Sequence, residues 1–331
     1  MMKAIRLAAC SILFAVLQVA ANCSATALAA TPQTFVSGAG NDSNPCTREA
    51  PCRTFTHVIA QSDAGGEIVV LDSAEYGPIS IDRNIAIEAS KGVYARIDMT
   101  SGGIGVDISP NATRVSLRGL KINSKGGTVN TGISFKSAGT LYVEDCILEG
   151  SQGLTLKAFG IAVSNGDPLT SNAGSVYVKN TAIRNWNVGI NADGFYAPND
   201  KFGLGAEITL EQVRLECNDV GLQVRQRHKA TIHDSVISGN GTGLSVFAGD
   251  FHSAKIVIER CVVAFSAGNG VETFGSDPNY PGVVVLSNSM VVNNSTGTHR
   301  GPGGSLFSRG NNTIEGNGTN IVGSLQTETG K

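Results

Sequence analysis

The chain contains 331 residues, of which 41 are glycine and only 16% are charged, and its formal net charge at pH 7 is −2. This balance excludes nucleic acid as the main partner, because binding to phosphates requires a basic surface. The abundance of glycine, with only 6% aromatic residues, fits a β protein whose short strands are joined by tight corners.

Residues 1–30 have the features of a secretory signal peptide. Lys3 and Arg6 form the charged start, residues 7–21 are apolar, and small residues near Ala29 offer a cleavage site. Because this segment carries two cations and no acid, the chain without it has a net charge near −4. The apolar run is shorter than the roughly 18 residues of a membrane span, so a retained anchor is the weaker alternative. We expect a secreted or periplasmic protein with no membrane span after cleavage.

Residues 31–65 are expected to form an N-terminal cap. They contain an opening strand near Phe35, a Pro-containing loop between Cys46 and Cys52, and a short helix. A solenoid has to cover its end, because a bare end exposes core and unpaired strand edges. In an exported protein, Cys46 and Cys52 are expected to form a disulfide, with free thiols as the alternative. Asp42 is expected to form a turn, with calcium binding as the alternative.

Residues 66–320 repeat one unit, which residues 174–193 show most clearly. Valines alternate with polar residues, and Asn and Gly corners then separate two further short apolar segments. A glycine followed by an alternating strand recurs every 22 to 32 residues, which is the period of a repeat architecture. These marker glycines are Gly105, Gly132, Gly160, Gly189, Gly221, Gly243 and Gly270.

Strands of about four to six residues are too short to pair within one coil, but coils stacked about 4.8 Å apart give each strand two neighbours. A β-sandwich is the alternative, but its turns recur about every 8–12 residues, and the longer period argues against it. The sequence therefore predicts an all-β fold, a parallel β-helix over residues 66–320, with residues 321–331 as a flexible tail. The corners are expected to need left-handed backbone angles at Asn180, Asn185, Asn218, Asn240 and Asn288.

The glycine-marked repeat resembles the right-handed parallel β-helix proteins of the pectate-lyase-like superfamily. The segment GNDSNPCTREAPCRTF, followed by GGEIVVLDSAEYGPISI, is similar to the start of exported bacterial members, many without an assigned activity. The resemblance, together with the rule for parallel crossovers, implies a right-handed helix. It also implies that the marked strands and the loops after them form a saccharide groove.

Counting the alternation from each marker glycine places Asp193 and Arg225 on outward positions of neighbouring coils, with His228 in the basic run that follows. These three residues are the candidate catalytic groups. The alternative is that Asp193 and Arg225 form a charge pair on a solvated face. Glu272 also points outward, but three strand spacings, about 14 Å, separate it from Asp193. That separation is too large for the paired carboxylates of a glycoside hydrolase.

Aromatic residues cluster in or next to the long loops that follow the marked strands. They are expected either to stack on sugar rings or to pack the loops onto the coils. No metal site is expected, because no CxxC pair occurs and Cys146, Cys217 and Cys261 fit small buried residues of the coils. The candidate substrate-binding residues are Phe195, Tyr196, Phe247, Phe251, Phe274 and Tyr280.

The leading hypothesis is an exported protein that engages a polysaccharide along one loop-lined edge. One alternative is a uronate lyase acting by β-elimination, in which Asp193 holds Ca²⁺ and Arg225 or a nearby base takes the proton. Another is a non-catalytic surface scaffold or adhesin. No cofactor is expected apart from Ca²⁺ in the lyase alternative, and the sequence leaves the glycan and the oligomeric state open.

Overall fold

Three parallel sheets account for almost all of the regular structure. The structure is a computed structural model that describes residues 32–100, 102–126, 130–151, 158–164, 174–193, 205–249 and 252–328. The predicted signal peptide lies outside the described residues. Within these ranges there are 32 strands and one helix, α2 (Phe55–Gln61). No helix in these ranges is both long enough and apolar enough to cross a membrane.

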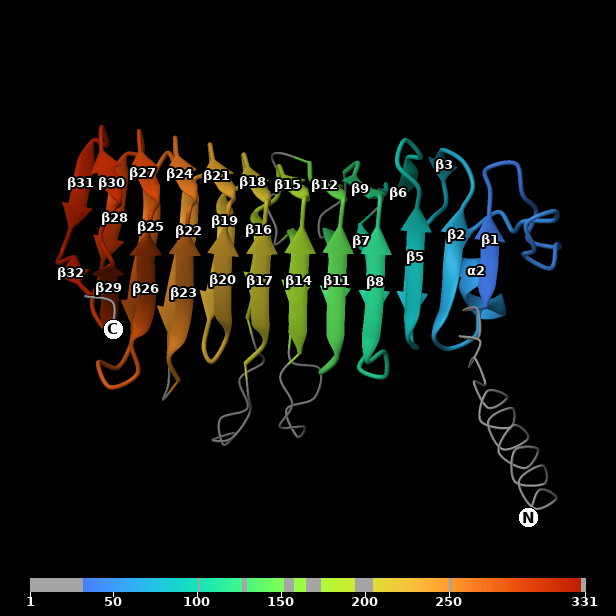
Figure 1. The fold of residues 1–331 in the computed structure, drawn as a ribbon, viewed down its shortest axis with the longest axis horizontal. Helices are drawn as coiled ribbons and strands as arrows, with labels where there is room; N and C mark the ends of the chain where they lie inside the picture. The colour runs from blue at the N-terminus through green and yellow to red at the C-terminus, as the bar shows by residue number, and fades with distance from the viewer. Residues whose placement is uncertain are drawn as a thin grey trace, which may run out of the picture. The chain divides into compact units, whose positions relative to one another are not determined.

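Each coil contributes one strand to sheet A, one to sheet B and one to sheet C, in that order along the chain (Figure 1). Sheet A contains β1 (Gln33–Val36), β2 (Gly66–Val70), β5 (Ile85–Ala89), β8 (Arg114–Arg118), β11 (Thr140–Glu144), β14 (Ser175–Lys179), β17 (Glu207–Glu211), β20 (Lys229–His233), β23 (Ala254–Glu259), β26 (Gly282–Ser287), β29 (Gly304–Ser308) and β32 (Gln326–Thr327).

The strands of sheet B are the shorter ones and follow those of sheet A after a tight corner. Sheet B contains β3 (Ala74–Glu75), β6 (Ala95–Met99), β9 (Leu120–Ser124), β12 (Ile147–Glu149), β15 (Ala182–Arg184), β18 (Arg214–Glu216), β21 (Val236–Ser238), β24 (Val262–Ala264), β27 (Met290–Val292) and β30 (Thr313–Glu315).

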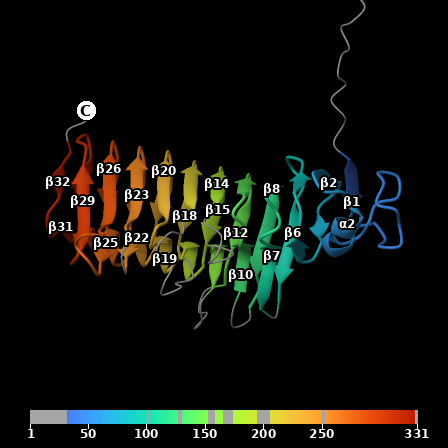
Figure 2. The same cartoon turned by 90° about the horizontal axis from the view of Figure 1, so that it is seen from below.

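The strands of sheet C include the glycine-marked segments. In Figure 2, strands such as β7 and β10 run along a different side of the coils from those of sheet A. Sheet C contains β4 (Ile79–Ile81), β7 (Gly103–Ile108), β10 (Asn130–Phe135), β13 (Phe159–Val163), β16 (Val188–Ala192), β19 (Val220–Arg225), β22 (Thr242–Ala248), β25 (Asn269–Gly275), β28 (Thr296–Arg300) and β31 (Thr319–Val322).

The core consists of aliphatic side chains stacked from coil to coil. Alternation along each strand turns every second residue inward, and parallel register then places like residues on top of one another. Burying one such side chain stabilises the fold by about 1.5–3 kcal/mol. One fully buried stack in sheet A comprises Ile68, Ile87, Leu117, Val143, Val178, Leu210, Ile232, Ile258 and Leu286.

The marker glycines stand in register in sheet C, one per coil. A Cβ atom added to Gly221 would lie 2.5 Å from the carbonyl oxygen of Gly243 in the next coil, and one added to Gly132 would lie 2.6 Å from that of Gly160. Neither Gly221 nor Gly132 has a left-handed backbone. Glycine is therefore required here by the close approach of neighbouring coils.

Asparagine serves the corners in two ways. Asn180, Asn185 and Asn288 have left-handed φ angles of 45°, 64° and 48°, as predicted. The same prediction is wrong for Asn218 and Asn240, which are buried between sheets B and C and are not left-handed. Instead, Nδ2 of Asn218 donates a hydrogen bond of 3.1 Å to Oδ1 of Asn240. The amide side chains thus form a ladder that satisfies polar groups inside the corner.

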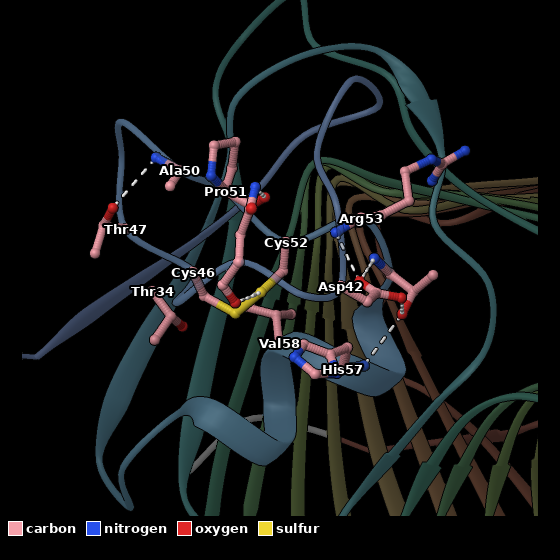
Figure 3. The surroundings of a disulfide bond; sticks show 12 residues. Thr34, Asp42, Cys46, Thr47, Ala50, Pro51, Cys52, Arg53, His57 and Val58 are labelled. Atoms are coloured by element: carbon pink, nitrogen blue, oxygen red, sulfur yellow. Dashed lines mark hydrogen bonds between the residues drawn. A yellow bond between two sulfur atoms is a disulfide. The ribbon is translucent and has the colours of Figure 1, made fainter.

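The segment before β2 closes the first coil. Strand β1 pairs with β2, and α2 packs against β1 and β4. The hydroxyl of Thr54 caps α2 by accepting the N–H of His57 at 3.2 Å (Figure 3). Burial raises the pKa of Asp42, but hydrogen bonds from Arg53 and Thr54 outweigh it and hold the pKa below its usual range. Asp42 therefore organises the loop, as expected of a turn-forming residue.

Cys46 and Cys52 form the predicted disulfide in this segment (Figure 3). Cys146 and Cys261 occupy equivalent corners between sheets A and B and are buried. The expectation of a buried residue is wrong for Cys217, which has a left-handed φ of 54° at the corner after β18 and is exposed. Burial raises the pKa of Cys146 to about 12 and that of Cys261 to about 11, so both remain neutral thiols that pack as core residues. At the other end, β32 pairs with β29, so strands continue past residue 320 into the segment expected to be a tail.

Candidate functional site

The outer face of sheet C carries two rows of side chains that are in register from coil to coil, at the outward positions the alternation predicts. Row 1 comprises Asp107, Ser134, Ala162, Asn191, Gln223, Ser245, Glu272 and His299. Row 2 lies two residues further along each strand and comprises Lys136, Ser164, Asp193, Arg225, Phe247 and Phe274.

Asp193 and Arg225 are neighbours in row 2, as predicted. Nη1 of Arg225 lies 3.4 Å from Oδ2 of Asp193, and the two side chains are 41% and 37% exposed, respectively. The Arg225 guanidinium also lies over the ring of Phe247, with Cζ 5.7 Å from the ring centroid. A half-exposed ion pair contributes about 1 kcal/mol or less to stability. The arrangement therefore presents charge beside an aromatic ring, and a catalytic role for the pair stays a prediction.

Row 2 continues from the ion pair into two phenylalanines on successive coils. Phe247 is 37% exposed and pairs in register with Phe274. Phe274 lies over Gly301, where any larger residue would collide with its ring. Tyr280 follows β25 and is also partly exposed. The other aromatic candidates, Phe195, Tyr196 and Phe251, lie outside the described residues.

One further coil adds a histidine that the sequence analysis missed. His299 pairs in register with Glu272. Nδ2 of Asn269 donates to Oε2 of Glu272 at 2.6 Å and lies 3.3 Å from Nδ1 of His299. The His299 ring packs edge-on against Phe274, with centroids 5.2 Å apart. The sequence does contain a sign of this position, because Gly297 continues the series of marker glycines by one more coil. His299 follows Gly297 by two residues and therefore falls in row 1.

His228 does not belong to this face. Its side chain is fully buried, and Nδ1 accepts the backbone N–H of Ala206 at 2.9 Å. Burial, and to a smaller extent the charge of Arg227, lower the pKa of His228 to about 4, so the imidazole is neutral at pH 7. The structure therefore corrects this candidate: an enclosed imidazole cannot reach a substrate, and His228 acts as an interior hydrogen-bond acceptor.

Three side-chain atoms on this face are buried without a hydrogen bond among the described residues: Oδ1 of Asp107 and of Asn191 in row 1, and Nε of Arg225 in row 2. Oδ1 of Asp107 has an ion-pair partner, Nζ of Lys136 at 2.7 Å. Buried polar atoms in native proteins are usually paired, and the exceptions gather where function requires them.

The described residues do not assemble a metal site on this face. The one group of three candidate ligands that they contain is Cys46, Cys52 and His57, whose ligand atoms lie within 4.8 Å of one another. Both sulfurs belong to the disulfide, so neither is available as a thiolate. Asp193 has Ser164 and Arg225 as its register neighbours, whereas Ca²⁺ takes 6–8 oxygen ligands.

Comparison with solved structures shows the same architecture. The pectate lyase Pel9A is 14% identical with a TM-score of 0.63, over 92% of this chain and 80% of that chain. An alginate lyase from Paenibacillus sp. str. FPU-7 is 12% identical with a TM-score of 0.57, over 89% and 99% of the two chains. XylC in complex with xylose is 10% identical with a TM-score of 0.54, over 89% and 70%. Identities this low show a shared fold alone.

No curated protein matches the chain in sequence. A family model for the right-handed β-helix region matches residues 131–319, which is more than half of the chain. The matched residues include most of the marker glycines and strands of all three parallel sheets. The chain therefore belongs to the right-handed β-helix family.

Proposed function

We propose that the protein binds a polysaccharide along the outer face of sheet C. The observation that carries the proposal is the unbroken sequence of row 2, in which the Asp193–Arg225 pair leads into Phe247 and Phe274 on successive coils. These four coils span about 14 Å, because neighbouring strands lie about 4.8 Å apart. Exposed rings flanked by a few polar groups are typical of a binding surface, and rings of this kind can stack on the apolar faces of sugars.

Two further observations support a glycan ligand in an exported protein. The solved structures that share the fold include proteins named as a pectate lyase and an alginate lyase, and both names refer to polysaccharides. The disulfide in the first coil suits an oxidising compartment, which agrees with a secreted or periplasmic location.

The arrangement of charges favours binding over β-elimination. A lyase needs a base beside the proton it removes and a cation that neutralises the neighbouring carboxylate. Arg225 is engaged by Asp193, and the buried His228 is out of reach of a ligand on sheet C. The lyase alternative nevertheless gives a distinct signal, the ultraviolet absorbance of an unsaturated uronate product.

The test is retention of the purified protein in native gels that contain a series of acidic and neutral polysaccharides. We expect Phe247→Ala and Phe274→Ala to weaken retention several-fold. Tyr177→Ala, which removes an exposed tyrosine from the outer face of sheet A, is the matched control and is expected to leave retention unchanged.

Equal retention of all three variants would refute binding along sheet C, and absence of retention on every polysaccharide would leave the scaffold alternative. Absorbance is recorded in parallel, with and without Ca²⁺. A rise in absorbance that is lost in Arg225→Ala would identify a lyase.

A further inference from the structure

The corners between sheets A and B form a regular row at the tips of the sheet A arrows in Figure 1. From the β8–β9 corner to the β26–β27 corner, each turns at a single left-handed residue. Gly119, Asp145, Asn180 and Gln212 are four consecutive examples, with φ angles of 72°, 54°, 45° and 55°. Asp145, Asn180 and Gln212 thus place polar side chains on three successive coils, along a line of about 10 Å, two strand spacings long.

The coil before this row breaks the pattern. Between β5 and β6 the corner is replaced by the longer loop of residues 90–94, so this loop stands beside the row of tighter corners. Two contacts hold it: the N–H of Val93 donates to the carbonyl of Ser90 at 2.9 Å, and the N–H of Tyr94 donates to the hydroxyl of Ser73 at 2.9 Å. Val93 also packs against the core. The loop is therefore a fixed wall.

The wall and the row of corners enclose a groove of about 800 Å³. Its floor is formed by the corners of the next four coils, from Gly119 to Gln212. This volume lies within the range of small-ligand sites in proteins. The groove is on a different part of the coils from rows 1 and 2 of sheet C, so it is separate from the polysaccharide face described above.

The charges that line the groove are unbalanced toward the positive. The lining contains four cationic side chains and two acidic ones, whereas the whole chain has a net charge of −2. Arg118 lies between both acids, with Nε 3.1 Å from Asp145 and Nη1 3.8 Å from Glu88. Lys91 is exposed on the wall and makes no ion pair within the described residues. Lys121 and Arg214 pair with acids just outside the lining, Glu149 at 3.7 Å and Glu216 at 2.6 Å, respectively. Among the described cations that line the groove, Lys91 is therefore the one available to a ligand.

An exposed aromatic ring completes the lining. Tyr94 is 60% exposed at the wall, although its backbone is held by Ser73. The amides of Asn180 and Gln212 line the far part of the groove and can both donate and accept hydrogen bonds. A ring for a sugar face, a cation for a carboxylate and amides for hydroxyls together match one class of ligand. We propose that this groove is a second binding site, which takes a short acidic oligosaccharide with Tyr94 against a sugar ring and Lys91 against a carboxylate.

The test measures the affinity of the purified full-length protein for two acidic tetrasaccharides, one of galacturonate and one of alginate, by titration calorimetry. A neutral glucose tetrasaccharide is the comparison ligand. We expect Tyr94→Ala to weaken the binding of an acidic tetrasaccharide about tenfold. Lys91→Ala should weaken it about threefold or more at low salt and less at high salt, because salt screens an exposed charge. Tyr177→Ala is the matched control, since it removes another exposed tyrosine outside the groove.

Three results would refute the proposed binding site. The first is that neither acidic tetrasaccharide binds, and the second is that the neutral tetrasaccharide binds as tightly as the acidic ones. The third is that Tyr94→Ala changes the affinity for an acidic tetrasaccharide no more than Tyr177→Ala does. Phe247→Ala separates this proposal from the one for sheet C. It is expected to leave tetrasaccharide binding unchanged while it weakens retention on long polysaccharides. Loss of retention on long polysaccharides thus reports on sheet C, and loss of tetrasaccharide binding in Tyr94→Ala reports on the groove.

Discussion

Gly221→Ala tests the reason for the ladder of marker glycines. The added Cβ would lie 2.5 Å from the carbonyl oxygen of Gly243, whereas ordinary contacts of a Cβ begin at 3.4 Å. Two further neighbours, Nδ2 of Asn240 at 3.3 Å and Cγ2 of Ile237 at 3.4 Å, belong to side chains and can adjust. The carbonyl oxygen cannot, because its strand is paired with strands on both sides.

The expected cost follows from that contact. Relieving the collision requires neighbouring strands to separate by nearly 1 Å at one point, and overpacking of this kind costs about 1–3 kcal/mol. We expect the upper end, about 3 kcal/mol, because the obstacle is a backbone atom. For a chain of this size, 1 kcal/mol shifts the midpoint of thermal unfolding by about 2 °C, so the midpoint should fall by about 6 °C.

The assay is thermal and urea unfolding followed by circular dichroism, with Gly77→Ala as the matched control. Gly77 has a left-handed φ of 76° and no atom within 4 Å of an added Cβ, so alanine there meets only backbone strain of about 1–2 kcal/mol. If Gly221→Ala were no more destabilising than Gly77→Ala, the close approach of coils would not explain the ladder.

Three other outcomes are expected. Asn240→Ala removes the acceptor of the Asn218 N–H and should cost about 1–3 kcal/mol of unfolding free energy in urea; a loss below 0.5 kcal/mol would contradict the amide ladder. Folding lowers the pKa of His228 from 6.5 to about 4, so stability is complete above pH 6.5 and is lost as the pH falls toward 4, by up to about 3 kcal/mol. Urea unfolding across this range should show that slope in the wild type and not in His228→Gln; equal slopes would exclude His228 as its source. Reduction of Cys46–Cys52 should destabilise the first coil by about 2 kcal/mol, and hydrogen exchange should rise there but not in the later coils.

The sequence repeat by itself determined the fold and which outward side chains of sheet C are adjacent on successive coils. Alternation decides which residues point outward, and one marker glycine per coil sets the register between coils. These two rules were enough to place Asp193 beside Arg225 and Phe247 beside Phe274. Applied to Gly297, the same two rules also place His299 beside Glu272.

Only the tertiary structure determined the positions of residues in irregular turns, where the alternation and the marker glycines give no register. His228 follows Gln226 and Arg227, two consecutive left-handed residues with φ angles of 21° and 62°. Neither residue type signals such a turn, so the pattern of basic residues gave no sign that the turn ends with the imidazole inside the coil. The side chain is buried because this turn and the neighbouring coils enclose it, and neither condition is local in sequence.

The groove beside sheets A and B has a similar origin. The sequence shows Tyr94 only as an aromatic residue between two alternating apolar segments, residues 85–89 and 95–99. The loop becomes a wall because the corners of the following coils, up to Gln212, are tighter and stack beside it. A repeat pattern determines which residues are equivalent from coil to coil. The hollow left beside an irregular loop depends on how far that loop projects past its equivalents, and only the packed coils decide this.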